Sequence, residues 1–376
     1  MTQARLVHVF PAFSTGGPEV RTAVLINAMT EFKHTIISLS GDQTGRTRLE
    51  APESISFVEA PRQSGVARLR ALAGTLRRQR PNLLITYGWG GTDAILAARL
   101  GGLAPPVHVE DGFLPDEAHG QKFLRLQARR LAFRLAADLL VPSRTLQRVA
   151  TATWWLPPRR VHFFPNGVDT NRFTPVSADH ARAARDQLGV LSGEVVIGTV
   201  GMLRPDKNHA RLIRAFSILV RQRPARLLIV GDGECRGALE ALTRELDIAD
   251  RVTFTGAVID PSRYYWPLDI FALSSDTEQM PLSILEAMAS GLPVVSTAVG
   301  DVLEMVGTSG AGLVSPLREE GALTANLLAL SSDIDLRRRL GSDNRARALT
   351  QFSLSRMIES YRAVFRRRIA PCGLED

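Results

Sequence analysis

Short apolar runs alternate with amphipathic segments along the whole chain, and this alternation predicts β-α units stacked on parallel sheets. In the first half the predicted strands are 5–10, 34–39, 83–87, 106–109 and 138–142. The second half repeats the scheme with strands at 194–200, 226–230, 252–255, 269–273 and 293–297, and with helices near 208–221, 236–246 and 281–290. The first of these helices has one apolar face, formed by Leu212, Ile213, Phe216, Leu219 and Val220.

A boundary between two domains is expected near 165–190, where turn-forming residues and two prolines separate the two halves. We therefore expect a first domain over 1–170 and a second over 171–353. Both would be α/β, doubly wound and Rossmann-like, facing each other across a cleft. Ligands of such folds bind outside the carboxyl ends of the strands, so the loops of both domains would border one site.

Composition limits the classes of protein that fit. A chain of 376 residues with 45% hydrophobic and 22% charged residues suits two folded domains and not a disordered or fibrous protein. No stretch approaches the ~20 apolar residues of a membrane span, and the first ten residues lack a secretion signal, so we expect a cytoplasmic protein. The two cysteines have no metal-ligand spacing, and no metal site is predicted.

The net charge of +8 lies entirely in the first 170 residues, because the rest of the chain is neutral. Such a surplus indicates an anionic partner, either nucleic acid or an acidic membrane surface. Genomic base composition is an alternative cause, since only three of the 46 basic residues are lysines. Two predicted helices carry much of the surplus, one with Arg68, Arg70, Arg77, Arg78 and Arg80, the other with Lys122, Arg125, Arg129, Arg130 and Arg134.

Two loops that follow strands have the features of anion sites. Gly16 and Gly17 come after the first strand and open a helix, which suits close approach of a ligand to the backbone. An ordinary strand-to-helix turn is the alternative, and the G-x-G-x-x-G fingerprint of dinucleotide sites is absent.

The second loop, Gly201 to Asn208, holds Arg204 and Lys207 at the start of a helix, where cations are unfavourable unless an anion lies between them. This pattern favours a phosphate, and an exposed charge pair is the alternative.

A third segment places two carboxylates eight residues apart, Glu278 in a loop and Glu286 in the helix that follows. Pro281 suits the first helical position, and the N–H groups from Leu282 to Ile284 could hold a phosphate oxygen. Glutamates among apolar residues need partners, and a carboxylate can accept two hydrogen bonds from the vicinal hydroxyls of a sugar or ribose. Exposed glutamates are the alternative interpretation.

The segment TEQMPLSILEAMASGLPVV resembles the E-x7-E segment of the family 4 retaining glycosyltransferases, which have the GT-B fold. Other pieces agree in order and spacing, namely the Gly16-Gly17 loop, Asn166 to Asp169 followed by Arg172-Phe173, the Gly201 loop, Gly231 to Gly233, and the aromatic C-terminal segment. The similarity extends over nearly the whole chain. It implies transfer of a sugar from a nucleotide diphosphate sugar to a glycan or lipid-linked acceptor, with retention and without a cofactor or metal.

The resemblance also implies roles for residues. Glu278 would hold hydroxyls of the donor sugar, Glu286 the ribose and Lys207 the diphosphate. Backbone N–H groups near Met280, Pro281, Leu282 and Ser283 would complete the phosphate cradle, with Gly201 and Gly233 beside it and Gly16-Gly17 closing over it. The C-terminal helix, 354–376, would cross back onto the first domain. The basic first domain could then contact an anionic membrane at its inner face during cell-surface polysaccharide, glycolipid or lipopolysaccharide synthesis, and a solvated charged face is the alternative.

The chain departs from the family pattern at two places. Met202 stands where the family commonly has a phosphate-binding arginine, and we expect Arg204 to substitute for it. Glu110 stands where a histidine is usual, with His108 on the same strand face, so either could act on the acceptor side. A packed strand residue is the alternative for His108. A sugar-nucleotide epimerase of the same architecture is an alternative function. A nucleic-acid-binding protein is a more remote one, since the chain has no known binding motif and only 6% aromatic residues.

Overall fold

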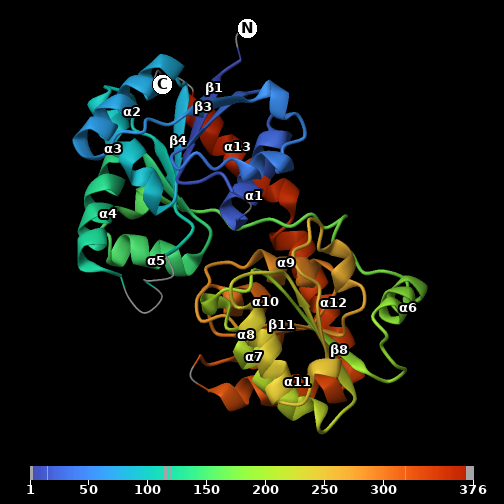
Figure 1. The fold of residues 1–376 in the computed structure, drawn as a ribbon. Coiled ribbons are helices and arrows are strands. Elements are labelled where there is room, and N and C mark those ends of the chain that lie inside the picture. The colour runs from blue at the N-terminus through green and yellow to red at the C-terminus, as the bar shows by residue number, and fades with distance from the viewer. Residues whose placement is uncertain (1–2, 15, 114–116, 118–120, 318, 370–376) are drawn as a thin grey trace. The chain divides into compact units, whose positions relative to one another are not determined.

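The computed structural model describes residues 3–14, 16–113, 117, 121–317 and 319–369 (Figure 1). Contacts between residues divide the chain into two units. One unit comprises Met1–Asn166 together with Met357–Asp376, and the other is Gly167–Arg356. Each unit is built around its own sheet, and the predicted cleft between them stays a prediction.

The first unit contains a seven-stranded parallel sheet in the order β3-β2-β1-β4-β5-β6-β7. Its strands are β1 (Arg5–Phe10), β2 (Lys33–Ser38), β3 (Ser56–Glu59), β4 (Leu83–Tyr87), β5 (Val107–Val109), β6 (Asp138–Val141) and β7 (Val161–Phe163). The main helices are α1 (Gly17–Ala28), α2 (Gly65–Gln79), α3 (Thr92–Leu100), α4 (Phe123–Leu135) and α5 (Arg144–Ala152). The unit also includes α13 (Leu354–Ile369) from Met357 onward. The strand order reverses between β1 and β4, which places the loops after these strands at the usual ligand position.

The second unit has a six-stranded sheet in the order β10-β9-β8-β11-β12-β13, and every recorded pairing in it is parallel. Its strands are β8 (Val195–Val200), β9 (Ala225–Val230), β10 (Val252–Phe254), β11 (Ile270–Leu273), β12 (Val294–Thr297) and β13 (Val314–Ser315). Its helices are α6 (Ala178–Gln187), α7 (His209–Val220), α8 (Arg236–Glu245), α9 (Leu282–Ala289), α10 (Val302–Gly310), α11 (Glu320–Ser332) and α12 (Ile334–Gln351). Here the order reverses between β8 and β11.

The predicted α/β class is confirmed, with two doubly wound parallel sheets. The central strands are buried on both faces, which explains why they are nearly continuous apolar runs. The predicted apolar face of α7 is also confirmed, because Leu212, Ile213, Phe216 and Leu219 are fully buried. We did not predict β3, β7 and β13, which are short or only partly buried strands with little apolar pattern.

Candidate functional site

The point where strand order reverses in the second unit brings two predicted loops together. Lys207 ends the short 3-10 turn Pro205–Lys207 after β8, and Glu278 follows the neighbouring strand β11. The Lys207 Nζ lies 2.5 Å from Glu278 Oε1, and the same oxygen accepts a hydrogen bond from Ser275 Oγ at 2.9 Å. Both charged side chains are mostly buried, at 21% and 12% exposure. An ammonium and a carboxylate therefore stand at the position where α/β folds bind ligands.

Hydrogen bonds between the two loops hold this pair in place. Asp276 N donates to Asp206 O at 2.8 Å, and Ser274 Oγ donates to Lys207 O at 3.1 Å. The Asp276 carboxylate also accepts from Asn208 Nδ2 at 3.1 Å and pairs with Arg211 at 2.8 Å. Asn208 itself has left-handed backbone (φ 44°) and caps α7. The Lys207 loop is thus fixed to the Glu278 loop on both sides of Lys207.

Glycines let neighbouring loops approach these two closely. A Cβ at Gly231 would lie 1.9 Å from Gly201 O, and one at Gly233 would lie 2.6 Å from Leu203 O. Gly300 (φ +51°) is similarly placed, since its Cβ would lie 2.6 Å from Glu278 O. A Cβ at Gly201 would instead meet open space among the described residues. The predicted glycines therefore serve loop packing at 233 and leave room at 201.

Glu286 lies on the second turn of α9, and its Oε2 accepts a hydrogen bond from Tyr265 Oη at 2.6 Å. Pro281 is the N-cap of α9 and not its first residue, so the helix begins one residue later than predicted. Ile284 N donates to Pro281 O at 3.2 Å, which removes it from the predicted set of open N–H groups. The N–H groups of Leu282 and Ser283 have no acceptor within the helix. Met280, which precedes them, is buried in the core.

The two cations predicted to need an anion already have carboxylate partners. Lys207 pairs with Glu278, and Arg204 pairs with Asp206 at 2.8 Å. Arg204 is 39% exposed. Met202, which stands at the position of the family arginine, is also exposed and has a thioether side chain without charge. Next to Lys207, burial and the Lys207 charge lower the pKa of His209 to about 4, so its imidazole adds no third positive charge near neutral pH.

The predicted residues of the first unit are placed at the end of β1 and in β5. Gly16 is the N-cap of α1 and Gly17 its first residue. Burial raises the pKa of Glu19, whose Oε2 would lie only 2.6 Å from a Cβ at Gly16. In the next turn of α1, Arg21 forms a buried bidentate pair with Asp111, with N–O distances of 2.5 and 2.8 Å. Sequence reasoning missed this pair, which joins α1 to the end of β5.

His108 and Glu110 are both buried, with exposures of 0% and 1%. His108 Nδ1 is bonded to Thr86 Oγ1 at 2.8 Å, and its ring packs on Phe133. His108 Nε2 lies 3.7 Å from Glu110 Oε2, and neither atom has a hydrogen-bond partner among the described residues. The structure brings these two predicted residues together inside the unit, and a role toward an acceptor stays a prediction.

One predicted surface residue is in fact internal. Arg129 is fully buried in the first unit and makes a bidentate pair with Glu117, at 2.8 and 2.7 Å. Trp89, Phe113 and Trp154 surround its guanidinium. Another face of α4 is exposed, since Phe123, Leu124 and Leu131 are 63 to 80% exposed. The exposed Trp155 stacks with Arg130 at 3.4 Å.

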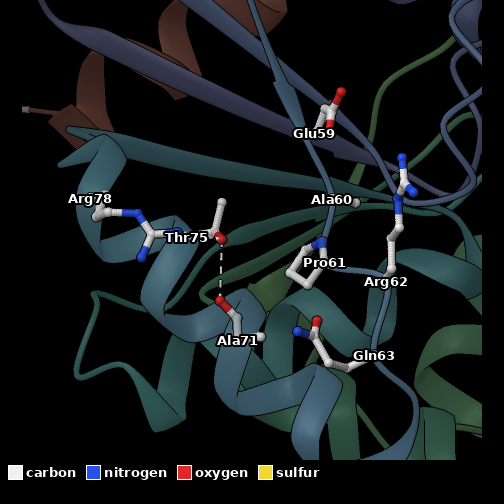
Figure 2. A pocket seen from close by; sticks show the side chains of 8 residues that line it. All are labelled: Glu59, Ala60, Pro61, Arg62, Gln63, Ala71, Thr75 and Arg78. Atoms are coloured by element: carbon white, nitrogen blue, oxygen red, sulfur yellow. Dashed lines mark hydrogen bonds between the residues drawn. The ribbon is translucent and has the colours of Figure 1, made fainter.

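A hollow of about 500 Å³ lies at the carboxyl end of β3, away from the residues predicted for the donor and acceptor sites, and Figure 2 shows the side chains that line it. Glu59 to Gln63 form one side and α2 the other, where Arg78 donates to Thr75 Oγ1 at 3.0 Å. Its charged and amide side chains are exposed, and the buried Thr75 hydroxyl is already bonded within α2 to Ala71 O at 3.1 Å. The hollow therefore adds no candidate chemistry to the site.

Comparisons with known proteins match both units. The model "Glycosyl transferases group 1" matches residues 194–333, and "Glycosyl transferase 4-like domain" matches residues 16–167. A D-inositol 3-phosphate glycosyltransferase of Nocardia farcinica is 36% identical over 48% of this chain and 42% of its own length. A GDP-mannose-dependent monoacylated alpha-(1-6)-phosphatidylinositol monomannoside mannosyltransferase of Corynebacterium glutamicum is 33% identical over 50% of this chain and 51% of its own. The matched regions thus span about half of these relatives.

Among solved structures, Anabaena Alr3699/HepE in complex with UDP superposes with a TM-score of 0.85 at 21% identity, covering 96% of this chain and 100% of that chain. The likeness at this identity is one of fold. The predicted GT-B architecture is thereby confirmed for the two sheets.

Proposed function

The chain belongs to the group 1 glycosyltransferases, family 4, and from this premise we propose that it transfers a sugar from a nucleoside diphosphate sugar to a hydroxyl acceptor. The anomeric configuration is retained, as in the family. The observation that carries the proposal is the Lys207–Glu278 pair where β8 and β11 end, with Glu286 on the following helix. These groups have the charges needed for a diphosphate, a sugar and a ribose.

Lys207 binds the diphosphate in this proposal, because breaking the bond between sugar and phosphate leaves its electron pair on a phosphate oxygen. A cation that gains interaction with this growing charge lowers the barrier. The acceptor oxygen forms the new bond to the anomeric carbon, and its proton passes to the leaving phosphate. When the ammonium turns toward phosphate, Glu278 is released to accept hydrogen bonds from sugar hydroxyls. Arg204 supplies the second cation in place of the family arginine, and no metal is required.

We propose that the acceptor is lipid-linked and is met at the inner face of an anionic membrane. The exposed face of α4 supports this, because it combines Phe123, Leu124 and Leu131 with the basic side chains Lys122 and Arg134. An apolar stripe flanked by cations is the composition of helices that lie in a membrane interface. None of the helices in the described ranges has the length and apolar character to cross a bilayer.

The donor site is tested by measuring thermal stabilisation of the wild type with UDP, GDP, ADP and their sugar conjugates, each with and without EDTA. We expect one nucleotide family to stabilise the protein with EDTA present. Lys207→Ala and Glu286→Ala should lose the effect, whereas Arg214→Ala, an exposed charge on α7, should keep it. A wild type that no nucleotide stabilises would overturn the proposal. Isomerisation of the sugar nucleotide without acceptor would favour the epimerase.

The membrane contact is tested by cosedimentation with vesicles of phosphatidylcholine alone or with 30% phosphatidylglycerol (about a third anionic, in the range that gives a strong surface potential). We expect binding only to the anionic vesicles, with loss in Leu124→Ser/Leu131→Ser. The matched control is Val66→Ser, which removes an exposed apolar side chain from α2. Equal binding by all three proteins would contradict a docking role for α4.

A further inference from the structure

Tyr265 lies directly beside the carboxylate of Glu286. Its hydroxyl oxygen is 2.6 Å from Glu286 Oε2 and 3.3 Å from Ser283 O. The tyrosine ends the 3-10 turn Ser262–Tyr265 and is 1% exposed, so the contact is made from inside the unit. Neither the motif analysis nor the spacing of the two glutamates indicated this residue.

In the contact between Tyr265 and Glu286, the phenol is the hydrogen-bond donor. Burial, together with the neighbouring Glu286 carboxylate, raises the pKa of Tyr265 well above its ordinary value, so the phenol keeps its proton. A phenol has one proton to donate, and the carboxylate oxygen at 2.6 Å is the nearer and stronger acceptor. Tyr265 therefore donates to Oε2 of Glu286.

The ring of Tyr265 is held between other aromatic rings. It stacks with Phe271 of β11 at 5.8 Å between centroids and meets Phe173 edge-on at 5.6 Å. Phe173 is the last residue of the Asn-Arg-Phe sequence, 171–173, inside the predicted boundary region, and Arg345 donates to its carbonyl oxygen at 2.8 Å. These contacts hold the phenol ring in place beside Glu286.

We propose that Tyr265 is a positioning residue that fixes the Glu286 carboxylate for contact with the ribose diol of the donor. The inference rests on the proposed function, in which Glu286 holds the ribose. One carboxylate oxygen fixed by a rigid donor sets the rotamer of the glutamate before the nucleotide arrives. Less conformational freedom is then lost on binding. The Asn-Arg-Phe segment contributes to the donor site through the contact of Phe173 with this ring.

Calorimetric titration of wild type, Tyr265→Phe and Glu286→Ala tests the inference. The probes are ADP, GDP and UDP, each compared with its 2′,3′-dideoxy form. Tyr265→Phe removes only the hydroxyl and keeps the ring packing. We expect it to weaken the preferred ribonucleotide about tenfold, as loss of a hydrogen bond to a charged group would, and to leave the dideoxy form within about twofold. The double variant Tyr265→Phe/Glu286→Ala should bind the ribonucleotide no more weakly than Glu286→Ala alone.

Tyr264→Phe is the matched control, because it removes a phenol hydroxyl from the same turn and should bind like the wild type. Equal weakening of the ribose and dideoxy forms by Tyr265→Phe would show a general structural effect and overturn the inference. An unchanged affinity of Tyr265→Phe for the ribonucleotide would also overturn the inference. In that case, loss of nucleotide binding in Lys207→Ala would leave the proposed function standing. A wild type that binds no nucleotide, or does not prefer the ribose form, would overturn the ribose role and the inference together.

Discussion

Lys207 and Glu278 carry opposite charges 2.5 Å apart. Ser275 is the other recorded partner of Glu278 Oε1. In the proposed reaction Lys207 would exchange the Glu278 carboxylate for a diphosphate, so most of the cost of removing water from its ammonium is already met in the free protein. Its interaction can then strengthen as charge grows on the leaving phosphate, which is the property of a group that acts on kcat.

Replacing Lys207 with alanine should therefore lower kcat by about 10² to 10³, as loss of one donor to a developing oxyanion does. The rate of sugar release or transfer from the preferred donor, measured at saturation, gives the comparison. Arg214→Ala is the control and should retain the wild-type rate, since it lies on the exposed side of α7. A Lys207→Ala variant within threefold of the wild-type kcat would remove Lys207 from the chemical step.

Gly300 supports Glu278 through its lack of a side chain. A Cβ there would lie 2.2 Å from Gln279 O and 2.6 Å from Glu278 O, and the backbone has φ +51°. We expect Gly300→Ala to displace the Glu278 loop and to lower both stability and kcat. Gly189→Ala is the matched control, since Gly189 has φ +63° but open space around its Cβ among the described residues. It should cost only the backbone strain, about 1 kcal/mol in urea unfolding, with kcat unchanged.

At the scale of elements, side chains from three neighbouring strands of the first unit form one buried chain of hydrogen bonds. His8 of β1 is bonded to Tyr87 of β4 at 2.9 Å and to His34 of β2 at 3.1 Å. The far nitrogen of His34 contacts Met29 O at 3.0 Å, so that nitrogen must carry a proton. His34 then accepts from His8, and His8 accepts from Tyr87. All of these hydrogen bonds can therefore form while both imidazoles are neutral.

Acid should therefore weaken the first unit. Burial, and for His8 also the neighbouring His34, lowers the pKa of both groups in the folded state. Below about pH 6.5 the unfolded chain binds protons that the folded chain does not, so the free energy of unfolding falls as pH falls. His8→Phe should show a shallower slope than wild type in urea unfolding between pH 7.5 and 5.5. The control His180→Gln, on the exposed side of α6, should keep the wild-type slope; parallel slopes for wild type and His8→Phe would contradict the argument.

The elements that could be predicted from the sequence are those with a clear apolar pattern in their own residues. The β1, β4, β8 and β11 strands are buried apolar runs, and α7 has a complete apolar face, so a local pattern was sufficient. The edge strand β3 is only partly buried and lacks such a pattern. Arg129 was predicted to be exposed because its partner Glu117 lies 12 residues away, and Tyr265 was missed because Glu286 lies 21 residues away. Such pairs depend on tertiary packing, which no short sequence pattern records.

At the scale of the whole molecule, the first unit is closed by residues from the far end of the chain. Tyr361 and Phe365 of α13 are buried in it, and the Tyr361 ring meets Phe164 at 5.1 Å. Nearby on the same helix, Arg362 pairs with Glu31 at 2.9 Å. At the end of α13, Arg368 pairs with Asp138 at 2.5 Å. A hydrogen bond with His162, followed by the hydrogen bond and charge of Arg368, lowers the pKa of the Asp138 carboxyl despite its burial. The stability of the first unit thus depends on the C-terminal segment.

Phe365→Ala should destabilise the first unit and leave the second unaffected. Truncating a fully buried phenylalanine costs about 3 to 5 kcal/mol, because it removes apolar burial and leaves a cavity. Peptide-resolved hydrogen exchange separates the two units, since amides of core strands exchange only through cooperative opening. We expect faster exchange in β1 and β4 and unchanged exchange in β8 and β11. The exposed Glu359→Ala on the same helix should alter neither set, and equal acceleration in both sheets would show that the two units unfold together.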